Sequence, residues 1–174
     1  MNILETDRLI LRPFSLADAP FIMELVNTPG WLAFIGDRNV HSVGDAENYL
    51  QNGPLKGYAD TGLGYWTVSR KEDLSKPIGS CGLMKRDTLQ DIDIGYALIP
   101  EFEGLGYATE AAQAVLSFAF ETKKVPRVVA ISTTDNVRSA KVLQKIGMKI
   151  EGTVRFSADD DELFVFGVEA PKYS

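Results

Sequence analysis

Residues 91–111 restrict the fold of this chain most strongly, because they read as a strand, a glycine-rich turn and the start of a helix. Pro100 ends the strand pattern, since proline donates no hydrogen bond to a neighbouring strand. Gly104 and Gly106 permit a close backbone approach. The N–H groups and the dipole of a helix N-terminus favour negative charge, so we expect a phosphate or diphosphate ligand here. Alternate strand residues are apolar (Ile92, Ile94, Tyr96 and Leu98), and apolar residues then recur at helical spacing (Ala108, Ala111, Val115, Phe118 and Ala119).

Two other classes of glycine turn fit this stretch poorly. The phosphate loop of nucleotide triphosphatases requires a Gly-Lys-Ser/Thr sequence, and no lysine follows Gly106. A dinucleotide-binding fingerprint requires a third small residue at fixed spacing and a later acidic residue. Residues 104–109 lack the third glycine, so a nucleotide-dependent oxidoreductase is the weakest of the alternatives.

The turn resembles the Gln/Arg-x-x-Gly-x-Gly/Ala turn of the GNAT superfamily of N-acetyltransferases, which cradles the pyrophosphate of acetyl-coenzyme A. Thr109-Glu110-Ala111 and the preceding Gly95-Tyr96 resemble the branch of ribosomal-protein-alanine N-acetyltransferases. The sequence departs from the family pattern at Glu103, where a carboxylate opposes the pyrophosphate unless its side chain points away. The resemblance implies that the cofactor-binding residues of the turn are Glu103, Gly104, Leu105, Gly106, Tyr107 and Ala108.

The order of predicted elements agrees with this resemblance over nearly the whole chain. A capping pattern at Ser15 begins a helix that ends at Thr28-Pro29-Gly30, and residues 31–41 read as a loop. Gly79 and Gly82 are candidate bulge sites. We expect one α/β domain over residues 1–174, with a mixed central sheet of about seven strands flanked by four helices. The strands are expected at 6–12, 65–68, 78–83, 91–99, 128–131, 149–154 and 163–168, and the helices after Ser15, after Ser42, at 107–120 and after Asn136.

Composition restricts the number of domains, the cellular compartment and the class of ligand. Its 174 residues suit one domain with a sizeable core. One cysteine, Cys81, excludes an internal disulfide framework and fits a reducing compartment, so we expect a cytoplasmic protein. No apolar run or signal-peptide pattern indicates a membrane. The net charge of −6 argues against nucleic-acid binding and favours a cationic substrate.

Acetyl transfer to an amine requires removal of a proton, because an alkylamine with a pKa near 10.4 is neutral in only ~1 molecule in 10³ at pH 7. Asp93 is the candidate general base, acting directly or through water. It is equally compatible with a solvated residue on the polar strand face or with a partner for Arg86. Asp91, two residues away, is the second candidate.

The resemblance also implies roles in binding and polarising the thioester. The Leu98 amide would polarise the carbonyl, and the main chain of Leu98 and Ile99 would pair with the pantetheine arm like an added strand. Asn136 and Ser139 match the Asn-x-x-Ser of the second cofactor motif. Asn136 is either a pantetheine ligand or a plain helix N-cap. Many relatives have a tyrosine shortly after this serine as general acid, but residues 140–143 contain none, so Ser139 or water would donate instead.

The acceptor side has weaker signals. Trp31, Phe34 and Arg38 are candidate substrate contacts in the predicted loop. His41 is the only histidine, so we expect neither a His-based triad nor a metal site. Cys81 lies in an apolar strand and reads as a small buried hydrophobe rather than a nucleophile.

The sequence therefore predicts an enzyme that moves acetyl from acetyl-coenzyme A to a primary amine within a ternary complex. The acceptor is a protein N-terminus or a small molecule, and the protein is a monomer or a homodimer. The alternative is a domain that binds acyl-coenzyme A without turnover, which Glu103 and the missing tyrosine would permit.

Overall fold

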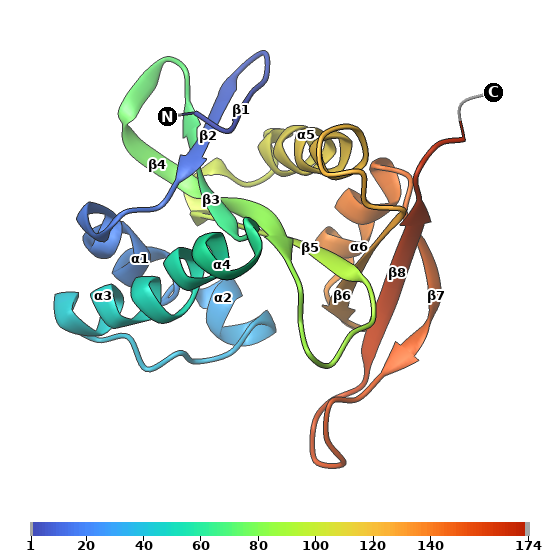
Figure 1. The fold of residues 1–174 in the computed structure, drawn as a ribbon. Coiled ribbons are helices and arrows are strands. Elements are labelled where there is room, and N and C mark those ends of the chain that lie inside the picture. The colour runs from blue at the N-terminus through green and yellow to red at the C-terminus, as the bar shows by residue number, and fades with distance from the viewer. Residues whose placement is uncertain (1, 173–174) are drawn as a thin grey trace.

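The computed structural model describes residues 2–172 and contains one mixed sheet between two layers of helices (Figure 1). Over those residues the sheet has eight strands in the order β1-β2-β3-β4-β5-β6-β8-β7. The expected mixed α/β sheet is confirmed, with eight strands rather than about seven and six helices rather than four. The strands are β1 (Leu4–Glu5), β2 (Leu9–Pro13), β3 (Tyr65–Arg70), β4 (Asp73–Met84), β5 (Ile92–Leu98), β6 (Arg127–Thr133), β7 (Lys149–Val154) and β8 (Leu163–Glu169). The helices are α1 (Ala19–Leu25), α2 (Pro29–Phe34), α3 (Val43–Asn52), α4 (Pro54–Thr61), α5 (Tyr107–Glu121) and α6 (Val137–Lys145), and the 3-10 turns are η1 (Leu16–Asp18) and η2 (Pro100–Phe102).

The only parallel pair within residues 2–172 is β5 with β6, and every other pair of neighbours is antiparallel. Parallel neighbours require a long crossover, and α5 provides it. The buried face of α5 is made largely of small residues, which lets the helix lie close to the sheet. These residues are Ala111, Ala112, Val115, Leu116 and Ala119.

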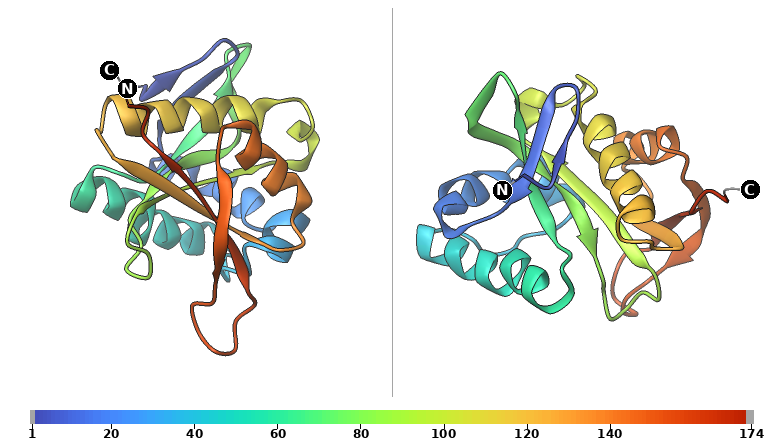
Figure 2. Two further views of the ribbon diagram at one scale, coloured as in Figure 1. Left: turned by 90° about the vertical axis from the view of Figure 1, so that its right-hand side faces the viewer. Right: turned by 45° about the horizontal axis from the view of Figure 1, so that its top comes forward.

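Helices cover both faces of the sheet, as the turned views show (Figure 2). The layer of α1 to α4 lies on one face, and α5 crosses the other, where Phe118 meets Trp66 edge to face with ring centroids 5.4 Å apart. The capping pattern at Ser15 is confirmed, because the Ser15 and Asp18 side chains form a capping box before α1. Cys81 is fully buried, which raises the pKa of its thiol to about 12, so its predicted role as a small core residue is confirmed.

Two helices replace segments that the sequence predicts to be irregular. Residues 31–41 were expected to form a loop, but α2 occupies the first part of that range. Thr28 caps α2 by accepting a hydrogen bond from the Trp31 amide (3.4 Å), and Pro29 occupies the first helical position, where its missing N–H costs nothing. Pro54 begins α4 in the same way. In both places a helix ends a few residues earlier, α1 at Leu25 and α3 at Asn52, and the proline begins the next helix.

The bulge prediction is confirmed beside Gly79 and wrong at Gly82. Val68 of β3 pairs with Gly79 and the next residue, Ser69, pairs with Pro77, so Ile78 is an extra residue on β4, whereas Gly82 pairs regularly with Tyr65. Both glycines are sites of close backbone approach, because an added Cβ would lie 2.3 Å from the Ala97 carbonyl oxygen at Gly79 and 2.2 Å from the Gly64 carbonyl oxygen at Gly82.

The elements that follow the turn agree with the sequence. α5 begins at Tyr107, Asn136 is the N-cap of α6, and Gly147 follows α6 with φ of +96°. Among the helices formed by residues 2–172, none is both long and apolar enough to cross a membrane.

Candidate functional site

The turn before α5 presents a row of free backbone N–H groups. Gly104 and Gly106 have φ of +75° and +87°, values that favour glycine. The Glu103 amide donates to the Pro100 carbonyl (3.1 Å) and the Glu110 amide to the Gly106 carbonyl (3.1 Å). Between them, no amide from residue 104 to 109 donates to an acceptor within residues 2–172. The turn therefore has the donors that an anion at a helix N-terminus requires.

The strand that leads into this turn separates from its neighbour. At the start of β5, Ile92 pairs with Val128 and Asp93 with Val129. Beyond Asp93 the two strands diverge, although β6 continues to Thr133 and remains paired with β8. The later part of β5 thus has a hydrogen-bonding edge that no strand covers among the described residues.

Leu98 lies on that open edge. The Ile99 amide donates to the Ile78 carbonyl (2.8 Å), toward β4. Because backbone groups alternate in direction along a strand, the N–H and C=O groups of Tyr96 and Leu98 point toward β6. The geometry thus offers Leu98 to a ligand, whereas the N–H of Ile99 is engaged and its carbonyl accepts from the Phe102 amide (2.9 Å).

Arg8 supports the turn from the start of β2, and sequence reasoning missed it. Its guanidinium donates to the Leu105 carbonyl (3.1 Å) and to Glu110 (3.2 Å), and it lies 4.3 Å from the centre of the Tyr107 ring. A Cβ added at Gly106 would lie 3.2 Å from its Nη2 atom. The partners of Arg8 are about a hundred positions away in the sequence, where no local pattern signals them.

The N-terminus of α6 completes this side of the site. Asn136 is a helix cap, because its Oδ1 accepts from the Ser139 amide (3.2 Å). Its side-chain N–H groups donate to nothing in the described part of the chain, so capping and ligand binding are compatible. Burial raises the pKa of the Tyr96 phenol, and the nearby Ser139 side chain partly offsets that shift. The structure therefore brings β5 and the predicted proton donor Ser139 together.

The Glu103 carboxylate, at the start of the turn, is paired with a positive charge. Its carboxylate forms an ion pair with Arg138 from the first turn of α6, with Nη1 and Oε2 separated by 2.5 Å. The nearby Glu103 charge also contributes to the raised pKa of Tyr96. The carboxylate that departs from the family pattern is thus neutralised by a second part of the same site.

Asp93 lies on the opposite face of β5 from Leu98, and its side chain is only 2% exposed. Its Oδ2 accepts from Nε of Arg86 (3.0 Å), so the predicted alternative of a partner for Arg86 is confirmed. Its Oδ1 is buried without a hydrogen-bond partner among residues 2–172. Burial raises the pKa of Asp93, and Arg86 opposes that shift. The Tyr65 phenol lies on the same face, and burial together with the Asp93 charge raises its pKa.

Asp18 shows how a fully satisfied buried carboxylate differs. Its two oxygens accept from both terminal nitrogens of Arg12 (2.9 and 2.8 Å), and Oδ2 also accepts from the Ser15 amide (2.9 Å). Burial would raise the pKa of Asp18, but these bonds outweigh it and the pKa is lowered. The contrast marks Asp93 as the carboxylate with capacity to accept a proton.

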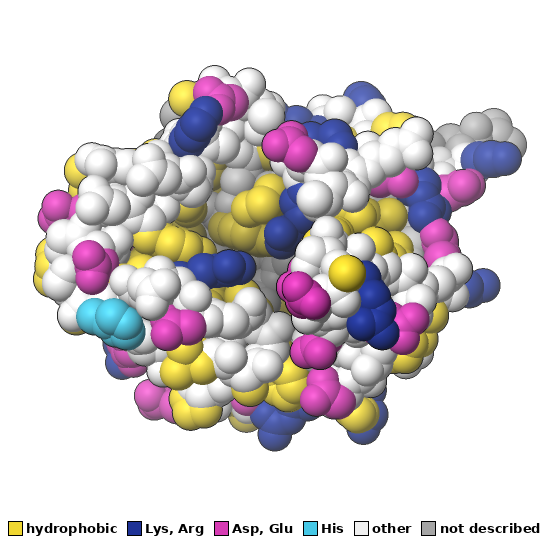
Figure 3. Space-filling view, turned by 90° about the horizontal axis from the view of Figure 1, so that it is seen from below, with side chains coloured by type: hydrophobic (Ala, Val, Ile, Leu, Met, Phe, Trp, Pro, Cys, Tyr) yellow, Lys and Arg dark blue, Asp and Glu magenta, His cyan; other side chains and the backbone are white. Residues whose placement is uncertain are grey.

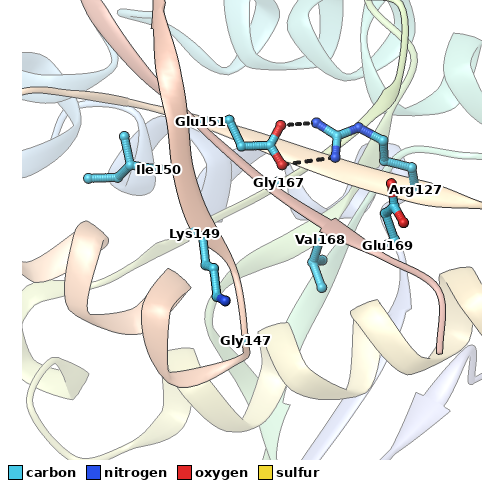
Figure 4. A pocket seen from close by; sticks show the side chains of 8 residues that line it. All are labelled: Arg127, Gly147, Lys149, Ile150, Glu151, Gly167, Val168 and Glu169. Carbon is cyan, nitrogen blue, oxygen red and sulfur yellow. Dashed lines mark hydrogen bonds and ion pairs between the residues drawn. The ribbon is translucent and has the colours of Figure 1, made fainter.

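The second candidate base, Asp91, is part of a surface ion-pair network. Its carboxylate accepts from Nε of Arg127 (3.2 Å), and Arg127 also forms a two-pronged pair with Glu151. This pair borders a pocket lined mainly by residues of β7 and β8 (Figure 4). None of the residues that line it belongs to the turn or to the open edge of β5. They are Arg127, Gly147, Lys149, Ile150, Glu151, Gly167, Val168 and Glu169.

The predicted acceptor residues lie in and after α2. Trp31 is half-buried against the core, and Phe34 is 39% exposed. Arg38 is exposed in the following loop, where its charge acts on the buried Tyr49 phenol together with that of Arg86. The face seen from below is hollowed between the half that holds α1–α4 and the half that holds β6–β8, with hydrophobic side chains deep in it and cationic ones on its walls (Figure 3).

Comparisons with known proteins identify this arrangement. Residues 8–149 match the model of the acetyltransferase (GNAT) domain. The chain is 32% identical over 155 residues to the uncharacterized N-acetyltransferase YoaA of Bacillus subtilis (strain 168), covering 88% of this chain and 86% of that protein.

Solved structures agree at the level of the fold. The ribosomal-protein-S5-alanine acetyltransferase of Vibrio fischeri superposes with a TM-score of 0.81 at 19% identity, covering 100% of this chain and 99% of the other. The microcin C7 self-immunity acetyltransferase MccE, solved in complex with acetyl-CoA and AMP, superposes with a TM-score of 0.76 at 17% identity, covering 94% and 93%. The predicted resemblance to the GNAT superfamily is confirmed, and the chain belongs to the GNAT family of N-acetyltransferases.

Proposed function

We propose that this protein transfers the acetyl group of acetyl-coenzyme A to a primary amine. The observation that carries the proposal is the row of free amides at residues 104–109, next to the uncovered edge of β5. Diphosphate requires such donors, and an extended pantetheine arm can add to a strand edge as a peptide does. The likeness to a fold solved with acetyl-CoA supports the choice of ligand.

The residues of this chain divide the binding of acetyl-coenzyme A between them. The amides of residues 104–109 would hold the diphosphate, the Leu98 main chain the pantetheine, and Asn136 a pantetheine amide through its free side-chain N–H groups. The Leu98 amide also faces the open edge, where it would stabilise charge on the thioester oxygen. The thioester is activated enough for an amine to attack it directly in a ternary complex, so the protein need supply no covalent intermediate.

Two residues are proposed to accept and donate the protons of the reaction. Asp93 belongs to β5, and Ser139 of α6 lies near the opposite face of that strand. Asp93 is the proposed base, and because its side chain is 2% exposed it would act through water at Oδ1 rather than by touching the amine. Ser139, beside the Tyr96 phenol, is the proposed donor to the departing thiolate. A thiol pKa near 8.5 makes that donor helpful rather than essential.

We propose that the acceptor enters from the side of α2, past Trp31, Phe34 and Arg38. An N-terminal peptide and a small-molecule amine are both consistent with this entrance. Incubation of the purified protein with acetyl-coenzyme A and a panel of peptides, polyamines and aminoglycosides should release free thiol with at least one acceptor. Absence of thiol release with every member of the panel would contradict acetyl transfer to amines of these classes.

The burial of Asp93 and the absence of tyrosine at positions 140–143 favour one second candidate, a domain that binds acyl-coenzyme A without turnover. Calorimetry distinguishes the two candidates. Tight binding of acetyl-coenzyme A with no thiol release across the panel would select the binding domain, whereas turnover with any acceptor would remove it.

A further inference from the structure

The ion pair between Glu103 and Arg138 spans the two elements that form the diphosphate side of the site. Glu103 precedes the free amides of the turn, and Arg138 lies two residues after the Asn136 cap. α6 lies beneath the N-terminal half of α5 in the left view of Figure 2. An anion bound to the amides of residues 104–109 would therefore meet both charges of this pair.

The pair is built to separate easily. The Arg138 side chain is 79% exposed, and that of Glu103 is 35% exposed. Ion pairs in such surroundings contribute only about 0–1 kcal/mol, because water screens the charges and two long side chains lose freedom. Within residues 2–172, no hydrogen bond other than the one to Glu103 holds the Arg138 guanidinium.

A bound diphosphate changes the balance of charge at this position. The free amides attract it, but the Glu103 carboxylate at the same turn repels it. Arginine forms paired hydrogen bonds with phosphate oxygens, and bonds between ionised groups are the stronger kind. A diphosphate thus competes with Glu103 for Arg138 and leaves the carboxylate without a partner.

We propose that Arg138 exchanges partners when coenzyme A binds, leaving Glu103 and contacting the diphosphate. This inference rests on the proposed function, because it assumes that the turn binds coenzyme A. Arg138 is then a cofactor-binding residue, and Glu103 is a competitor that weakens binding. The exchange also favours ligands that carry the diphosphate over pantetheine, which lacks it.

Calorimetry with coenzyme A and with pantetheine tests the exchange in three variants. Arg138→Gln should raise the Kd for coenzyme A about tenfold, or ~1.4 kcal/mol. Glu103→Gln should lower that Kd several-fold, because it removes the repulsion and releases Arg138. In the double variant, Arg138→Gln should still weaken binding relative to Glu103→Gln alone. Pantetheine binding should not change.

Lys145→Gln is the matched control, because it removes one positive charge from the last turn of the same helix. The exchange is overturned if Arg138→Gln weakens binding no more than Lys145→Gln does, or if Arg138→Gln has no effect once Glu103 is already Gln. A wild-type protein that binds no coenzyme A would instead contradict the proposed function. The two failures are therefore distinguishable.

Discussion

Two sides of β5 differ in how they are made. The side that we propose binds coenzyme A, here called the cofactor side, comprises the open edge at Leu98, the turn of residues 103–109 and the start of α6. It is built mainly from backbone groups. The side that we propose binds the amine, here called the acceptor side, comprises α1–α4 and the group around Asp93. It is built from side chains. Asp93, Arg86, Tyr65 and Tyr49 come from three strands or loops and one helix.

The difference in construction leads to different expectations for substitutions on the two sides. Backbone donors depend on chain conformation, so a few glycines and caps preserve them while other residues change. A site made of side chains changes with every substitution. We therefore expect variants on the cofactor side to alter coenzyme A binding and variants on the acceptor side to alter turnover and acceptor recognition.

The largest effect should come from Asp93→Asn. Loss of a general base costs about 10²–10⁴-fold in rate, so turnover at neutral pH should fall by that range and lose its rise with pH. The Kd for coenzyme A should stay near the wild-type value. Asp18→Asn is the matched control, because it alters a buried carboxylate paired with arginine and should leave the pH profile of turnover unchanged. An unchanged profile in Asp93→Asn would remove that residue from catalysis.

Gly106→Val should disrupt the turn of residues 103–109 and weaken the binding of coenzyme A. The residue has φ of +87°, and an added side chain would crowd Arg8. We expect the Kd for coenzyme A to rise about 100-fold, or ~2.7 kcal/mol, with the fold retained by circular dichroism. Gly152→Val is the control, since its Cβ would enter open space at a negative or extended φ. Equal affinity in the two variants would mean that the turn does not bind the ligand.

Phe34→Ala should sharpen the comparison from the acceptor side. This side chain is 39% exposed on α2, so its removal should raise the KM for the amine about fivefold, or ~1 kcal/mol, and leave the Kd for coenzyme A unchanged. Leu74→Ala removes a similarly exposed apolar side chain from β4 and should change neither quantity. A shift in coenzyme A affinity in Phe34→Ala would contradict the separation of the two sides.

The smallest effect should appear in the pH dependence of stability. The pKa of Asp18 is lowered from 3.8, so its contribution is present above pH 3.8 and is lost as the pH falls through the folded pKa. The pKa of Asp93 is raised from 3.8, so as the pH falls this carboxylate binds a proton in the folded state before it does so in the unfolded state. The free energy of unfolding should therefore rise as the pH falls through the folded pKa. The free energy of unfolding can be measured by denaturant unfolding at several pH values in wild type, Asp18→Asn and Asp93→Asn. The slope of this free energy against pH should change in opposite directions in the two variants. A change in the same direction in both would contradict this assignment.

Much of the cofactor side could be predicted from the sequence because its signals are local. The strand period, two glycines and the cap at Asn136 each lie within a few residues of the groups that they position. Contacts between residues far apart in the sequence have no local pattern that predicts them. Arg8 supports a turn about a hundred positions away, and Glu103 pairs with Arg138 across 35 positions. α2 was missed because Thr28-Pro29 signals both the end of one helix and the start of another. The pairing of Asp93 with Arg86 was foreseen as an alternative, but burial could not be read from alternation alone.

The central claim is that backbone amides from Gly104 to Thr109 bind the diphosphate beside the open edge of β5. Amide chemical shifts in ¹⁵N-labelled protein, followed as coenzyme A is added, test it most directly. We predict the largest changes at residues 104–109 and at Leu98, with smaller ones in α1–α4. Saturable binding that leaves the shifts of residues 104–109 in place would contradict the account.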